Sequence, residues 1–212
     1  ALDAKSGETV WENKYAAPLP DGMDPEFGRG PRATPLIVGG RVYSFGVGGR
    51  LQCLDQKTGT VIWSHDLVSE AGAKSPEFGF ASSPLAYKNS LIAAVGGPGC
   101  GIMGFDLATG SVLWQKHDFV NTYSSPITIT VDGKDEVVLL VDREAVGIDP
   151  TSGDIEWRFA HVNEWKTNIA TPLWGSDHIL TVSSGGDAGT RGLKITRKDG
   201  KFAAEEVWST RK

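Results

Sequence analysis

The chain has 212 residues, of which 40% are hydrophobic and 22% are charged, a composition typical of a globular protein rather than a disordered one. Its formal net charge is −5 and it contains no basic stripe, which argues against a surface for nucleic acid or an anionic membrane. No apolar stretch approaches the roughly 18 residues that cross a bilayer, so no transmembrane segment is predicted. The two cysteines, Cys53 and Cys100, exclude a disulfide scaffold and leave open either a single bridge or two buried thiols.

A turn with the pattern Asp-x-x-Ser/Thr-Gly, followed by a tryptophan, recurs along the chain. The motif runs from Asp3 to Trp11, from Asp55 to Trp63, from Asp106 to Trp114 and from Asp149 to Trp157, with a degenerate copy from Asp199 to Trp208. A second motif, Ser/Thr-Pro followed by an apolar residue, lies in phase with it at 34–36, 83–85, 125–127 and 171–173. A repeat of this length indicates one supersecondary unit per period.

Each unit predicts four short strands separated by turns. Strand A follows the Ser/Thr-Pro pair, strand B covers the next apolar run, strand C ends at the Asp, and strand D carries the Trp. The Asp side chain can bond local backbone amides, and the Gly can take a left-handed conformation without steric cost. The large indole is then expected to pack between neighbouring four-stranded units. The predicted docking residues are Trp11, Trp63, Trp114, Trp157 and Trp208.

This spacing resembles the tryptophan-docking motif of the pyrroloquinoline-quinone-like β-propeller family. That family includes quinone-dependent dehydrogenases and cofactor-free relatives such as the outer-membrane barrel-assembly scaffold lipoprotein. The resemblance covers residues 1–11 and 33–208. It implies an all-β fold and a ring of seven or eight blades, of which this chain supplies about four and a half four-stranded antiparallel blades.

We therefore expect residues 1–212 to form one incomplete β-propeller domain. A partial blade, comprising strands C and D, is predicted at 1–13, and complete blades are predicted at about 32–66, 82–118, 123–160 and 168–210. An open propeller leaves two apolar blade faces uncovered. The remaining blades are expected from the rest of a longer chain or, alternatively, from a second copy.

The connections from strand D to the next strand A are long and predict a binding face. Two of them, 14–31 and 67–81, carry the sequence Pro-Glu-Phe-Gly, and long loops on a rigid scaffold often carry function. In a propeller these connections emerge on the same face as the B-to-C turns. The candidate ligand-binding residues are Glu26, Phe27, Arg29, Glu77, Phe78, Phe80, Tyr123, Trp165 and Lys166. A structural alternative is that each Phe only plugs the top of its blade.

No catalytic or metal-binding constellation can be assembled from the sequence. The glycine-rich stretches at 46–49, 96–101 and 185–189 precede strands rather than helices, which predicts hairpins and not a phosphate cradle. The histidines His65, His117, His161 and His178 lack the spacing of metal ligands.

Two functions of different classes follow. The first is a non-catalytic binding or scaffolding propeller without a cofactor, whose loop face holds a peptide, a glycan or a partner protein. The second is a fragment of an alcohol or sugar dehydrogenase that uses pyrroloquinoline quinone with calcium. The adjacent cysteines that the resemblance implies for the alcohol-oxidising branch are absent from this sequence, which favours the first function. The resemblance also implies a periplasmic, secreted or cell-surface location.

Overall fold

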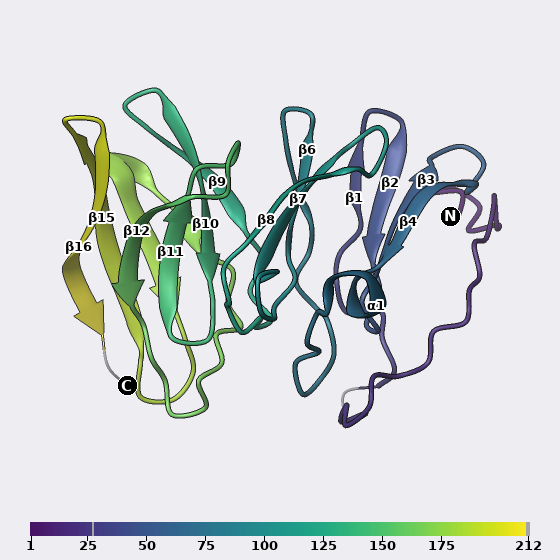
Figure 1. Cartoon of the computed structure of the whole chain (residues 1–212), viewed down its shortest axis with the longest axis horizontal. Coiled ribbons are helices and arrows are strands. Elements are labelled where there is room, and N and C mark those ends of the chain that lie inside the picture. Colours follow the sequence, from purple (N-terminus) through teal and green to yellow (C-terminus); the bar gives the residue numbers. More distant parts are fainter. Residues whose placement is uncertain (27, 211–212) are drawn as a thin grey trace.

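A computed structural model describes residues 1–26 and 28–210 and confirms the all-β propeller prediction. Four four-stranded sheets follow one another, each with its strands in sequence order and every neighbouring pair antiparallel. Figure 1 shows the sheets side by side as an open arc, with the two termini at opposite ends. The arc does not close into a ring.

The sheets span residues 36–66, 85–116, 127–160 and 173–210. The first contains β1 (Leu36–Val38), β2 (Arg41–Phe45), β3 (Arg50–Asp55) and β4 (Val61–Asp66), and the second contains β5 (Leu85–Tyr87), β6 (Ser90–Ala94), β7 (Ile102–Asp106) and β8 (Val112–Lys116). The third contains β9 (Ile127–Val131), β10 (Lys134–Leu140), β11 (Glu144–Ile148) and β12 (Ile155–Ala160), and the fourth contains β13 (Leu173–Trp174), β14 (Ile179–Ser183), β15 (Thr190–Lys198) and β16 (Lys201–Thr210).

Helical structure is confined to two short segments of the described chain, α1 (Leu67–Ala71) and a 3-10 turn at Ser176–His178. Within the described residues no helix has the length and apolar character needed to span a membrane. The partial blade predicted at 1–13 contains a turn but no β-strand. Only one isolated bridge forms there, between Leu2 and Thr9, because the segment offers too few residues on either side of its turn for a ladder.

The hydrophobic core lies between the sheets. One cluster of buried side chains joins the first and second sheets, a second joins the second and third, and a third joins the third and fourth. Cys53 and Cys100 are both buried free thiols in the first of these clusters, so the disulfide alternative is not realised.

The Asp-x-x-Ser/Thr-Gly turns form as the sequence predicts. Oδ1 of Asp55 accepts hydrogen bonds from the amides of Thr58 at 2.8 Å and Lys57 at 2.9 Å, and Gly59 takes a φ of 71°. The hydrogen bonds from Thr58, followed by that from Lys57, hold the pKa of Asp55 below its usual value. The same pattern recurs at Asp3, Asp106 and Asp149. The turns at Asp55, Asp106 and Asp149 are thus held closed, and the tryptophan of the preceding repeat packs on each of them.

Each of the first three tryptophans lies flat against the glycine of the next turn. The indole N–H of Trp63 donates to the carbonyl of Leu107 at 3.2 Å, and a Cβ placed on Gly110 would lie 2.7 Å from the Trp63 ring. Trp11 makes the equivalent contacts with Gln56 and Gly59. Burying an aromatic side chain of this size contributes roughly 4–6 kcal/mol as an upper bound. The repeat thus encodes the contact between blades.

The opposite face of each indole packs on its own blade. Trp114 lies across from Gly104 in the register of β7 and β8, and Trp157 lies across from Gly147 in that of β11 and β12. A β-bulge follows each of these glycines, which turns the tryptophan toward the neighbouring sheet. Cys53 takes the same position opposite Trp63.

The contact between the third and fourth sheets departs from this scheme. The long β15–β16 hairpin ends in a tight turn at Asp199 and Gly200, so it presents no docking glycine to Trp157. The Trp157 indole N–H instead donates to Oε2 of Glu136 at 2.6 Å. Glu136 is fully buried, its Oε1 has no partner, and burial raises its pKa to about 7. Trp208 packs against Gly192 but remains 41% exposed.

Substituting a docking glycine tests the contact between blades. Gly110→Ala introduces a Cβ both at φ of 77° and against the Trp63 ring, whereas Gly133→Ala meets the same backbone strain at φ of 75° with nothing within 4 Å. We expect Gly133→Ala to cost about 1 kcal/mol of unfolding free energy and Gly110→Ala to cost about 2–3 kcal/mol more. Urea unfolding measures both, and equal losses would contradict the docking role of Gly110.

The buried carboxyl of Glu136 predicts a pH dependence. Because its pKa is higher in the folded protein than in the unfolded chain, protonation stabilises the fold fully below about pH 4.5, and this contribution is lost as the pH rises through 7. Glu136→Gln keeps an acceptor for Trp157 and cannot ionise. Between pH 5 and pH 8 we expect the variant to gain about 2–3 kcal/mol relative to the unsubstituted protein. Parallel curves of unfolding free energy against pH would refute the assignment.

Candidate functional site

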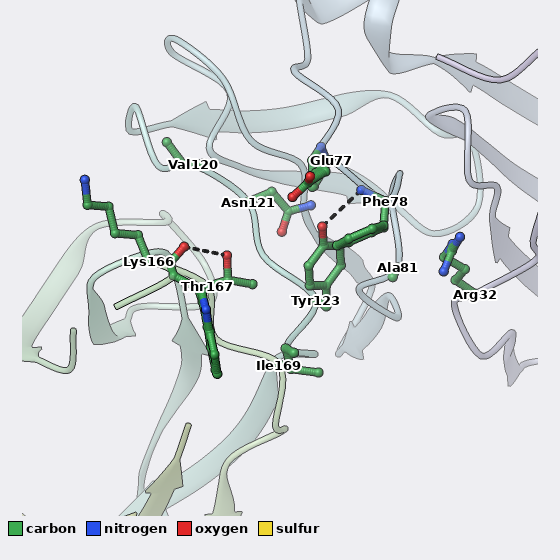
Figure 2. Close-up of a pocket in the computed structure, with 12 residues that line it drawn as sticks. Arg32, Glu77, Phe78, Ala81, Val120, Asn121, Tyr123, Lys166, Thr167 and Ile169 are labelled. Atoms are coloured by element: carbon green, nitrogen blue, oxygen red, sulfur yellow. Dashed lines mark hydrogen bonds between the residues drawn. The ribbon is translucent and has the colours of Figure 1, made fainter. Parts of the chain in front are cut away.

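The D-to-A connections of successive blades meet around one cavity of about 930 Å³. Side chains from four of these connections line it, and Figure 2 shows them converging, with Tyr123 near the middle. Five predicted candidates line it, namely Glu77, Phe78, Tyr123, Trp165 and Lys166. The volume lies in the upper part of the range typical of ligand pockets.

The other predicted candidates lie elsewhere. Glu26 and Arg29 are exposed and do not line the cavity. Phe80 is fully buried and packs against Phe45, with ring centroids 5.2 Å apart, so it belongs to the core. Phe27 lies outside the described residues.

Sequence reasoning missed seven lining residues: Arg32, Pro76, Ala81, Val120, Asn121, Thr167 and Ile169. All seven lie within three residues of a predicted candidate, and their shared position in the D-to-A connections was the available signal. Most are small or aliphatic, and the sequence alone gives no reason to separate them from ordinary loop residues.

The Ser/Thr-Pro motif links the connections to one another. The amide of Thr34 donates to the Ser83 hydroxyl at 2.9 Å, and the amide of Ser83 donates to the Ser125 hydroxyl at 3.0 Å. The Ser124 hydroxyl in turn donates to the carbonyl of Ala170 at 2.9 Å. This ladder ties each blade to the next at the point where its loop enters strand A, so the loops are held in a fixed relation.

Tyr123 joins two of the loops. Its hydroxyl accepts a hydrogen bond from the amide of Phe78 at 3.1 Å, and the two rings lie 6.0 Å apart at 46°. The pKa of Tyr123 is raised, chiefly because the side chain is buried. The hydrogen bond from Phe78 lowers this pKa, the Glu77 carboxylate raises it and the Arg32 guanidinium lowers it. The hydroxyl therefore stays neutral and retains a proton to donate.

A tight turn displays Trp165 at the edge of the cavity. The Asn163 side chain donates to the carbonyl of Thr167 at 2.5 Å and accepts from its amide at 3.1 Å, which closes the turn. Lys166 is held at a φ of 50°, an unusual conformation for a residue with a side chain. The Trp165 ring rests near Gly185 and remains 63% exposed.

Most neutral polar groups of the cavity already have partners within the protein. The amide nitrogen of Asn121 donates to the carbonyl of Ala94 at 3.1 Å, and the Thr167 hydroxyl donates to the carbonyl of Trp165 at 3.1 Å. Three charged side chains, Arg32, Glu77 and Lys166, also line the cavity.

The buried thiols and the buried imidazole of the described chain lie outside the cavity lining. Burial raises the pKa values of the Cys53 and Cys100 thiols, which disfavours the reactive thiolate. Burial also lowers the pKa of His161 to about 4, so this imidazole is neutral near pH 7. The part of the chain that the structure describes contains no group of three or more His, Cys, Asp or Glu residues able to hold a metal ion.

Comparisons with known proteins agree with the resemblance inferred from the docking motif. A family model described as outer membrane protein assembly factor BamB matches residues 1–186. Quinohemoprotein alcohol dehydrogenase ADH IIB of Pseudomonas putida is 29% identical over 128 residues, covering 54% of this chain and 16% of that protein. Quinoprotein alcohol dehydrogenase PedH of Pseudomonas putida is 28% identical over 121 residues, covering 55% and 19%.

Solved structures share the fold. BamB from Moraxella catarrhalis has a TM-score of 0.67 at 18% identity, over 99% of this chain and 57% of that chain. Quinohemoprotein alcohol dehydrogenase ADHIIG from Pseudomonas putida HK5 has a TM-score of 0.62 at 18% identity, over 86% and 34%. The chain therefore spans less than a fifth of the dehydrogenases that it matches by sequence, and little more than half of the BamB chain.

Removing the Asn163 side chain tests how the Trp165 turn is held. In Asn163→Ala the Thr167 amide loses its acceptor, and we expect its hydrogen exchange to accelerate about 5- to 30-fold, as the loss of about 1–2 kcal/mol implies. Asn89→Ala is the matched control, because Asn89 is exposed in a different turn. Unchanged exchange at Thr167 would show that the turn holds without Asn163.

Proposed function

The chain belongs to the family of the outer membrane protein assembly factor BamB, and from this membership and the geometry of its loop face we propose that it is a non-catalytic scaffolding propeller that binds a partner protein. The bound element is an apolar segment of the partner, held in the cavity between the D-to-A connections. The family's name supports a role in assembly at the outer membrane, hence a periplasmic or cell-surface site of action.

The observation that carries this proposal is the exposed apolar lining of the cavity. Trp165 and Ile169 are each 63% exposed and Val120 is 59% exposed, although all three stand on a rigid framework. Contiguous exposed apolar surface of this kind marks interaction sites in folded proteins. Covering an exposed side chain of this size contributes roughly 1.5–3 kcal/mol, which supports binding by a few apolar side chains.

The pairing of polar groups favours a peptide over a glycan. A sugar presents many hydroxyl groups, each of which needs a partner when it leaves water. Asn121 and Thr167 already use their amide nitrogen and hydroxyl within the protein. Apolar side chains of a peptide need no such partners, so they suit this lining better.

The quinoprotein alternative is supported by the two Pseudomonas putida dehydrogenases, which are 28–29% identical to this chain over the aligned residues. Pyrroloquinoline quinone with calcium would require a cluster of oxygen ligands. The cavity lining contains one carboxylate, Glu77, and the described residues form no metal-binding group. These residues do not fit the cofactor, so the alternative ranks below partner binding.

A matched pair of isoleucines tests the proposed site. Ile169 and Ile37 are 63% and 61% exposed, but only Ile169 lines the cavity. We expect fluorescein-labelled short peptides with Leu, Val and Phe centres to bind, Ile169→Ser to weaken binding about 10-fold, and Ile37→Ser to leave it unchanged. Fluorescence polarisation measures the Kd.

Two results would overturn the proposal. One is equal weakening by both isoleucine variants, which would place the peptides outside the cavity. The other is tight, stoichiometric binding of pyrroloquinoline quinone with calcium, together with alcohol-dependent dye reduction, which would establish the dehydrogenase instead.

A further inference from the structure

Two cationic side chains stand on opposite sides of the cavity. Figure 2 shows Lys166 at one side and Arg32 at the other, with Tyr123 and Ile169 between them. Resting on the proposed function, we infer that the bound segment carries an acidic residue on each side of its apolar centre. One carboxylate would meet Lys166 and the other would meet Arg32.

Neither cation has an ionic partner among the described residues. Three cationic side chains of the third and fourth sheets do form ion pairs: Lys134 with Asp149 at 2.9 Å, Arg158 with Glu144 at 2.5 Å and Arg191 with Glu206 at 3.3 Å. In a chain of net charge −5, carboxylates are plentiful, yet Arg32 and Lys166 form no such pair. Both are therefore available to a carboxylate from outside.

Arg32 has hydrogen-bond donors to spare. One terminal nitrogen donates to the carbonyl of Gly28 at 2.8 Å, which fixes the side chain, while Nε is buried and has no partner. A guanidinium that is anchored by one donor and retains others is suited to a carboxylate, which accepts two parallel hydrogen bonds.

Lys166 is presented by the Asn163 turn. Its left-handed backbone is retained because its own amide donates to the carbonyl of Asn163 at 3.0 Å and the Asn163 side chain closes the turn. Lys166 and its neighbour in the chain, the exposed Trp165, line the same cavity. A bound segment that places an apolar side chain against Trp165 and a carboxylate at Lys166 would make a favourable contact with each of these residues.

Glu77 limits where the acidic residues can lie. Its side chain is exposed and lines the cavity close enough to Tyr123 to raise the pKa of that hydroxyl. A carboxylate in the middle of the bound segment would be repelled by it. The charges of the cavity thus favour acid–apolar–acid over a uniformly acidic or a basic segment.

The test compares three labelled peptides that share one apolar centre of Leu, Val and Phe and differ in their flanks: Asp, Asn or Lys. We expect the Asp-flanked peptide to bind about 3- to 10-fold more tightly than the Asn-flanked one, and the Lys-flanked peptide to bind most weakly. The advantage of Asp should shrink when the salt concentration is raised from about 20 mM to about 200 mM.

Variants assign the effect to the two cations. Arg32→Gln and Lys166→Gln should each reduce the preference for Asp over Asn about 2- to 3-fold, measured for each variant as the ratio of its Kd values for the two peptides. Lys57→Gln, an exposed lysine of the β3–β4 turn, is the matched control and should leave the preference intact.

The outcomes separate this inference from the function on which it rests. If the Asn-flanked peptide binds as tightly as the Asp-flanked one, the charge preference is wrong and partner binding stands. If none of the three binds, or if an oligosaccharide binds to the cavity instead, both are overturned.

Discussion

The packing of a flat indole against the turn glycine of the next blade is the contact on which the arc depends. An indole can lie against a backbone only where no Cβ intervenes, and Gly104 and Gly153 leave both faces of Trp114 clear. The second glycine also closes the turn that the preceding Asp holds rigid, so turn formation and blade contact use the same residue. Local and tertiary preferences therefore agree in each complete repeat.

Where the repeat degenerates, the contact changes its chemistry. The fourth sheet offers Trp157 no docking glycine, and the indole N–H is satisfied by the carboxyl of Glu136. A backbone carbonyl carries no titratable proton, whereas a buried carboxyl does. Because burial raises the pKa of Glu136 to about 7, the contact between the third and fourth sheets responds to pH near neutrality.

A rigid framework of blades allows the D-to-A connections to expose apolar side chains without collapsing. The ladder through Ser83 and Ser125 fixes where the loops begin, and the hydrogen bond between Phe78 and Tyr123 joins two of them. The lining thereby combines exposed apolar side chains with the charged side chains of Arg32, Glu77 and Lys166.

The sequence by itself determined the blades, their order and the tryptophans that join them, because an Asp-capped turn and a large aromatic act through nearby residues and repeat at a regular spacing. It also located the face on which the long loops lie. Only the tertiary structure decided that Phe78 faces the cavity while Phe80 enters the core, and that Ile169 and Arg32 join the same lining. The physical reason is that the loops of neighbouring blades orient each loop side chain. The positions of those loops cannot be read from a local sequence pattern.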